Sequence, residues 1–180
     1  MTGGPDSLAL SSALRPARRP ASTEAPIFAA LVAGTAASVL SSMALLICGR
    51  LDGRSAAAPT NATSHWLWGP RALAATAVSV RYTLVGYAIH HAMSIFWALV
   101  HRRIRRPRPP PLPLARDLAE SAGTAALAFV VDYTITPRRL RPGFEHHLSA
   151  RSMFIVYAAF ALGLALASRA TDGRAGKEAP

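Results

Sequence analysis

The sequence contains little cysteine, little lysine and few acidic residues. Its single cysteine, Cys48, excludes an intramolecular disulfide and any metal site that needs two thiolates from one chain. We predict that Cys48 packs as an apolar residue. Only 9 residues are Asp or Glu, against 20 Lys or Arg, so the formal net charge is +11.

The common motifs of soluble enzymes are missing as well. The chain has no P-loop, no G-x-S-x-G, no H-E-x-x-H and no dinucleotide-binding glycine pattern. These absences do not exclude a membrane enzyme built from scattered Asp, His and Glu residues. The sequence therefore indicates no particular reaction.

What the sequence does contain is long apolar runs with charge clustered between them. Hydrophobic residues make up 51% of the 180 positions. A soluble protein of such positive charge would suggest a nucleic-acid partner, but basic clusters between apolar runs are typical of membrane proteins. We therefore predict a membrane protein that does not bind nucleic acid.

Four segments are predicted to cross the bilayer as helices, because a span needs about 20 mainly apolar residues. The third is the weakest, since it begins with Arg116, Asp117 and Glu120 and carries Asp132 near its far end. The apolar segment Ala72–Val80 either forms a helix that lies on the surface or extends the second span. The predicted spans are residues 27–48, 82–100, 114–135 and 152–168.

The predicted fold is therefore all-α, an integral membrane bundle of four transmembrane helices over residues 25–169. Residues 1–24 and 170–180 are predicted to be flexible tails. Trp66 and Trp68, between the first two spans, suit the aromatic belt at a membrane interface.

Small residues recur every four positions in three of the spans, a pattern that lets helix backbones approach closely in lipid. We expect close packing at each of these rows. They are Ala30, Gly34, Ser38 and Ser42 in the first span, Ala119 and Gly123 in the third, and Ala159, Gly163 and Ala167 in the last.

The distribution of basic residues predicts the orientation. With four spans, twelve basic residues fall on the side of the two termini and eight on the other, so both termini are predicted to be cytoplasmic, in a bacterial inner membrane. The densest cluster, Arg102–Arg108, is followed by three consecutive prolines. A nucleic-acid arm and a proline-rich ligand are alternatives, but we favour a short cytoplasmic loop that contacts anionic lipid headgroups.

The second span carries a polar and aromatic stripe on one side. Steps of four and three residues bring Tyr87, His90 and Ser94 onto one face, and His91 lies about 100° further round. Ionisable residues inside a bilayer normally find partners. We therefore predict an intramembrane polar network, in which a water or two would separate His90 from Asp132. Its members are His90, His91, Asp132, Tyr87, Ser94, Ser38 and Ser42.

Three hypotheses follow for this network. The favoured one is an interhelical hydrogen-bond network that specifies a structural or accessory bundle. The second is a path for protons, ions or a small solute, which would require a homo-oligomer because four spans are few for a carrier. The third is haem or metal held by His90 or His91 with His65, His101, His146 or His147. No cofactor is predicted under the favoured hypothesis.

A second group of candidate ligands falls in the predicted outer loops. His65, Glu145, His146 and His147 are residue types that bind metals, and outer-surface metal binding is easier than a haem site inside one bundle. The metal itself is not specified by the sequence.

Three stretches resemble a family of small, uncharacterised bacterial inner-membrane proteins with four spans. The resemblance extends over roughly residues 27–168 and implies a membrane bundle without an established reaction. It is carried by Asn61-Ala62-Thr63-Ser64-His65-Trp66, by His90-His91 with Ser94, Phe96 and Trp97, and by Asp132-Tyr133 with Pro137, Leu140 and Pro142-Gly143-Phe144-Glu145.

Overall fold

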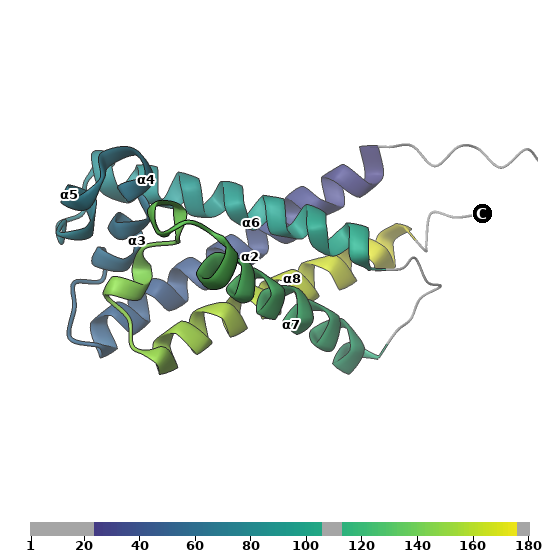
Figure 1. The fold of residues 1–180 in the computed structure, drawn as a ribbon. Coiled ribbons are helices and arrows are strands. Elements are labelled where there is room, and N and C mark those ends of the chain that lie inside the picture. Colours follow the sequence, from purple (N-terminus) through teal and green to yellow (C-terminus); the bar gives the residue numbers. More distant parts are fainter. Residues whose placement is uncertain (1–23, 106–112, 176–180) are drawn as a thin grey trace, which may run out of the picture.

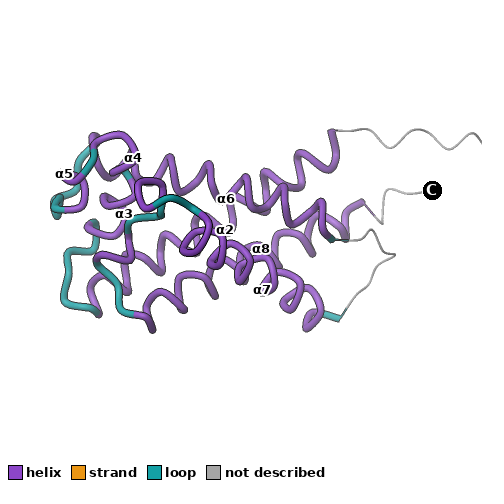
Figure 2. The backbone as a smooth tube through the Cα atoms, viewed as in Figure 1, coloured by secondary structure: helices purple, strands orange, loops and turns teal. Residues whose placement is uncertain are grey.

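The computed structural model describes residues 24–105 and 113–175. In this part of the chain every regular element is helical and no strand occurs (Figure 1, Figure 2). Three helices are long and apolar enough to cross a membrane, over Ile27–Leu51, Val80–Ile104 and Ala150–Gly173. The predicted all-α membrane class is therefore confirmed, with three candidate spans.

Four long helices pack around one another. Helix α2 contacts α6 and α8, and α7 contacts α8 and, far less, α6. Figure 1 shows that α2 and α7 run in one direction and α6 and α8 in the other, so the described chain begins and ends at the same end of the bundle. The four helices are α2 (Glu24–Leu51), α6 (Val85–Ile104), α7 (Leu114–Val130) and α8 (Ala150–Ala175).

Two of the long helices include a wider π-helical turn. Val80–Leu84 precedes α6 and Val131–Ile135 continues α7, both at the end of the bundle opposite the chain termini. The third predicted span, residues 114–135, coincides with α7 and its π turn. It is not among the three candidate membrane spans, because it carries Arg116, Asp117, Glu120 and Asp132.

Small residues allow α2 to approach both of its neighbours closely, as predicted. A Cβ added to Gly34 would lie 2.6 Å from the Cα of Ile95 in α6, and one added to Gly163 would lie 2.7 Å from the Ala36 carbonyl oxygen in α2. The prediction is wrong for Gly123, where an added Cβ would meet nothing within 4 Å. Its face of α7 is exposed, so the glycine there does not mark a helix contact.

The segment between α2 and α6 is not the open loop that its composition suggests. It forms three short helices, and every residue of the first is buried. Asn61 is completely buried and donates from Nδ2 to the carbonyl oxygens of Ala75 and Ala77 at 3.0 and 2.9 Å, while its Oδ1 accepts from Thr83 at 2.6 Å. These helices are α3 (Ala58–Thr63), α4 (His65–Trp68) and α5 (Pro70–Leu73).

The segment Ala72–Val80 as a whole is therefore neither a surface helix nor an extension of the second span. Its first two residues end α5, and residues 74–79 are non-helical because Asn61 binds their carbonyl groups instead. The second span begins at Val80.

The short helices and residues 136–149 together form a cap over one end of the bundle. The Trp66 indole donates to the Arg141 carbonyl at 2.9 Å, and the backbone N–H of Ser149 donates to Asp52 at 2.7 Å, which lowers the pKa of that carboxyl. His147 donates from Nε2 to the Leu73 carbonyl at 2.9 Å, although its burial still lowers the pKa of the imidazole. The cap thus joins two segments that are far apart in the sequence.

The predicted C-terminal tail begins later than expected. Residues 170–175 continue α8 instead of leaving the bundle, because Asp172 in the last turns pairs with Arg102 and Arg105 of α6. Of the predicted N-terminal tail, residues 1–24, only Glu24 is described, and it begins α2. Residues 1–23 and 176–180 lie outside the described chain.

The glycine contacts generate a test of the fold. Gly163→Ala should lower the free energy of unfolding by about 1–3 kcal/mol, because its Cβ would press against the backbone of α2. Gly123→Ala is the matched control: it should leave stability unchanged or raise it by up to about 1 kcal/mol through helix propensity. Equilibrium unfolding in detergent, followed by circular dichroism, measures both. Equal effects of the two substitutions would contradict this packing.

Candidate functional site

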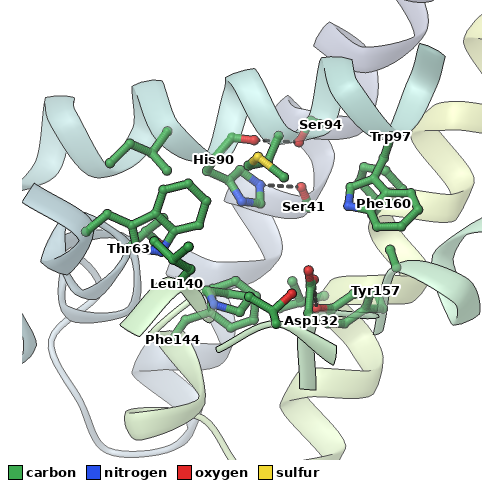
Figure 3. Close-up of a pocket in the computed structure, with 17 residues that line it drawn as sticks. Ser41, Thr63, His90, Ser94, Trp97, Asp132, Leu140, Phe144, Tyr157 and Phe160 are labelled. Carbon is green, nitrogen blue, oxygen red and sulfur yellow. Dashed lines mark hydrogen bonds between the residues drawn. The ribbon is translucent and has the colours of Figure 1, made fainter. Parts of the chain in front are cut away.

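A cavity of about 250 Å³ lies between the four long helices, just beneath the cap. Helices α6 and α7, which carry its two polar walls, make few contacts with each other. Figure 3 shows His90 and Asp132 on opposite walls, with Trp97 and Phe160 toward one side. The lining residues are Ser41, Thr63, Trp66, Ile89, His90, Met93, Ser94, Trp97, Ala128, Asp132, Thr136, Leu140, Pro142, Phe144, Val156, Tyr157 and Phe160.

The His90 wall is held in place by Ser41 of α2. The Ser41 hydroxyl donates to the Ala37 carbonyl one turn earlier, at 2.7 Å, and its oxygen lies 2.8 Å from His90 Nε2. With the hydroxyl hydrogen on the Ala37 carbonyl, His90 donates from Nε2, and a neutral His90 then carries its free lone pair on Nδ1. Ser41 therefore orients the imidazole from behind.

The Asp132 wall is held in place by Tyr157 of α8. The tyrosine hydroxyl donates to Asp132 Oδ2 at 2.7 Å. Asp132 lies in the π turn Val131–Ile135, which rotates the following side chains relative to a continuous α-helix and is a frequent device at functional sites. Among the described residues, Asp132 forms no ion pair with an arginine.

The remaining walls are largely apolar and include five aromatic side chains. Phe144 is placed by Gly143, whose φ of +92° suits glycine and whose added Cβ would lie 2.7 Å from the Ala62 carbonyl. The rings of Phe144 and Tyr157 lie 6.4 Å apart between centroids, and those of His90 and Phe144 6.5 Å apart. The aromatic residues that line the cavity are Trp66, Trp97, Phe144, Tyr157 and Phe160.

A second, larger hollow of about 740 Å³ lies on the outer side of α7 and α8. Its walls are almost entirely apolar, apart from Tyr133 and Glu145 at one end, whose hydroxyl and carboxylate lie 3.4 Å apart. Tyr157 lines both this groove and the cavity, so its ring forms part of the wall between them.

The structure brings together some of the predicted network and separates the rest. His90, Ser94 and Asp132 line one cavity, as the sequence suggested, but no hydrogen bond joins His90 to Asp132. Tyr87 instead stacks on His91, with ring centroids 5.7 Å apart, and neither lines the cavity. Ser38 and Ser42 also lie outside it, with hydroxyls that are buried without a hydrogen-bond partner.

Sequence reasoning missed the two residues that orient the site, Ser41 and Tyr157. Ser41 follows Gly34 by seven residues, two helical turns, so it lies on the same face of α2. Since Gly34 contacts α6, that periodicity could have identified Ser41 as the partner of His90. No comparable signal marks Tyr157, because nothing in the sequence places α8 beside the end of α7.

The structure does not arrange the predicted outer-loop residues as a metal site. In the described part of the chain, no group of three or more His, Cys, Asp or Glu residues is placed to hold a metal ion. His65 donates from Nδ1 to the Ala62 carbonyl at 2.8 Å, and His147 binds the carbonyl of Leu73 instead. Glu145 faces Tyr133, and His146 is exposed to solvent. His65 and His147 thus hold the backbone of the cap in place.

The opposite end of the bundle holds an ion-pair cluster around Arg105. This arginine pairs with Asp117, with Glu120 at 3.0 Å and with Asp172 at 2.8 Å, so it ties α6 to α7 and α8. Its side chain is only 11% exposed, and it is therefore not free to contact lipid headgroups as predicted. Arg103 is exposed, whereas Arg106 and Arg108 lie outside the described residues.

A second histidine and hydroxyl pair lies next to this cluster. Thr124 donates to the Glu120 carbonyl at 3.1 Å, so its oxygen accepts from Nδ1 of His101 at 2.8 Å. His101 is 1% exposed, and its Nε2 has no hydrogen-bond partner. These contacts occupy one ring nitrogen of each histidine, Nδ1 of His65 and His101 and Nε2 of His147, so only the other nitrogen could ligate haem or a metal.

Comparison with known proteins adds no further constraint. No family model, no curated protein and no solved structure matches the chain. The resemblance to small four-span bacterial membrane proteins therefore stays a prediction.

The Asp132 wall generates a test of the site. Tyr157→Phe removes the hydroxyl that donates to Asp132, so it should lower the free energy of unfolding in detergent by about 1 kcal/mol, a typical loss for an interhelical hydrogen bond in a membrane protein. Tyr133→Phe is the matched control. Its hydroxyl lies 3.4 Å from Glu145, too far for a strong bond, so the loss should be smaller. A larger loss for Tyr133→Phe would contradict this assignment.

Proposed function

We propose that the chain is a four-span membrane protein that binds a small solute in the cavity beneath its cap. One observation carries the proposal: His90 and Asp132 are each held from behind by a partner of their own, and they face one another across open space. A purely structural network would be expected to join such groups directly, since buried polar groups are costly when they are left without a partner.

The composition of the cavity supports binding. Ligand sites are concave, mostly apolar and equipped with a few convergent polar groups, and this cavity combines aromatic walls with one imidazole and one carboxylate. At about 250 Å³ it suits a small solute better than a large cofactor such as haem. The cavity is complete within one chain, so binding needs no second copy.

Binding is favoured over a continuous conduit for the same solute. On the side away from the cap, the cavity ends at a layer of packed side chains that includes Trp97, Ala98, Phe160 and Leu164. The ion pairs of Arg105 lie further along in the same direction. An open path through the bundle would have to cross both.

The proposed fourth crossing is made by α7. The helix α6 ends beside the ion-pair cluster and α8 begins at the cap, so α7 has to bring the chain back along the bundle. With its π turn it covers residues 114–135, about 33 Å at 1.5 Å per residue, which matches a hydrocarbon core. The acidic residues of its first turns are paired with arginines, which reduces the cost of placing them at the membrane interface. We place both termini in the cytoplasm of a bacterial cell.

Cysteine labelling tests this topology. In a Cys48→Ala background, single cysteines replace Arg54, Arg103 or Arg139, all exposed positions. A membrane-impermeant maleimide should label Arg54→Cys and Arg139→Cys in intact cells, and Arg103→Cys only after lysis. If α7 does not cross, Arg139→Cys will behave like Arg103→Cys.

A cavity-filling variant tests solute binding. Ala128→Phe places a ring in the cavity, whereas Ala126→Phe, two residues away, places one on the exposed outer face of the same helix. Small molecules released from purified wild-type protein should be identified by mass spectrometry and tested for raising its melting temperature. We expect a stabilising solute for the wild type and for Ala126→Phe but none for Ala128→Phe. A wild-type protein that neither carries nor responds to any solute would overturn the proposal.

A further inference from the structure

We propose further that the solute is a small organic ammonium ion, bound with its charged nitrogen beside Asp132 and a hydrogen-bond donor directed at His90. This inference rests on the proposed function, since it names the class of molecule that the same cavity takes.

The first argument is charge. Asp132 contributes the only carboxylate among the residues that line the cavity in the described chain, and no Lys or Arg lines it. The arginines of the basic end pair with Asp117, Glu120 and Asp172 instead. An anionic ligand would therefore find no positive charge within the cavity, whereas a cation would find an unpaired negative one.

The second argument is the direction of the hydrogen bonds. The hydrogens of Ser41, Ser94 and Tyr157 are already donated, to Ala37, to the His90 carbonyl and to Asp132. The Trp66 indole donates to Arg141. The two groups that face each other across the cavity both accept: His90 through Nδ1 in its neutral tautomer, and Asp132 through its carboxylate. A ligand that bridges them has to donate a hydrogen bond to His90 and to offer Asp132 either a donor or a positive charge.

The third argument is the aromatic lining. Phe144 and Tyr157 lie on the Asp132 side of the cavity, and Phe160 lies beside Trp97 toward one side of it (Figure 3). The negative faces of such rings attract organic cations, and the attraction increases when the cation is shielded from water. A carboxylate among aromatic rings therefore favours an alkylammonium group over a small hydrated metal ion, which needs several oxygen ligands.

The inference is tested with full-length protein in detergent and three ammonium probes: tetramethylammonium, ethanolammonium and choline. The uncharged comparison is the carbon isostere of choline, in which a carbon atom replaces the nitrogen. Isothermal titration calorimetry measures the dissociation constants. We expect at least one ammonium probe to bind saturably, and the isostere to bind at least about tenfold more weakly than choline.

Three variants locate the bound charge. Asp132→Asn retains an oxygen that accepts from Tyr157, so the wall can stay intact while its charge is lost, and affinity for the ammonium probe should fall at least about tenfold. Asp132→Glu keeps the charge and should preserve the preference for choline over its isostere. Glu145→Gln removes a nearby carboxylate that does not line the cavity, and it should change affinity by less than about threefold. Melting curves establish that each variant is folded.

The possible outcomes separate this inference from the proposed function. If choline and its isostere bind equally well, or if Asp132→Asn leaves ammonium affinity unchanged, the ammonium inference is overturned. Ammonium binding that survives Ala128→Phe would overturn it too, because the probe would then lie outside the cavity. If another solute binds and is lost only in Ala128→Phe, the proposed function stands without this inference. If no solute binds at all, both fail.

Discussion

The close approach of α2 to both α6 and α8 is the constraint on which the rest of the structure depends. Gly34 and Gly163 allow backbones to meet where any side chain would separate them. This contact fixes the register of α2 against α6, and two turns beyond Gly34 the same face brings Ser41 to His90. The orientation of the candidate site is thus a consequence of helix packing, and the hydroxyl serves as a fixed acceptor because its hydrogen is bound within α2.

Buried carboxylates are stabilised in different ways at the two ends of the bundle. At the end of the bundle where the described chain begins and ends, Arg105 satisfies several carboxylates at once, and the helices are joined by charge. Beneath the cap, Asp132 receives only a tyrosine hydroxyl and keeps its charge unpaired among the described residues. A carboxylate paired with arginine stabilises contacts between helices, whereas an unpaired carboxylate is available to a ligand that enters the cavity.

The sequence predicted the helices better than it predicted what lies between them. Hydropathy and small-residue spacing located the long helices to within a few residues at most ends, and the stripe on the second span correctly brought His90 and Ser94 to one face. The cap could not be predicted, because Asn61 looks like any polar loop residue until its partners at Ala75, Ala77 and Thr83 are known. Tyr87 and His91 were assigned to the network because helical periodicity gives their direction from the axis but not the helix they face.

Asn61 also bears on how the cap becomes ordered. Its side chain reaches two carbonyls in residues 75–77 and a hydroxyl at the start of the next long helix, and it is wholly shielded from water. The Asn61 amide forms all of its hydrogen bonds only when these three partner groups are in place. A partly folded cap would bury the amide away from water without its partners. Ordering of residues 75–77 and of the start of the next long helix is therefore coupled, because one amide bonds to both, and the roof of the cavity cannot open there without breaking those hydrogen bonds.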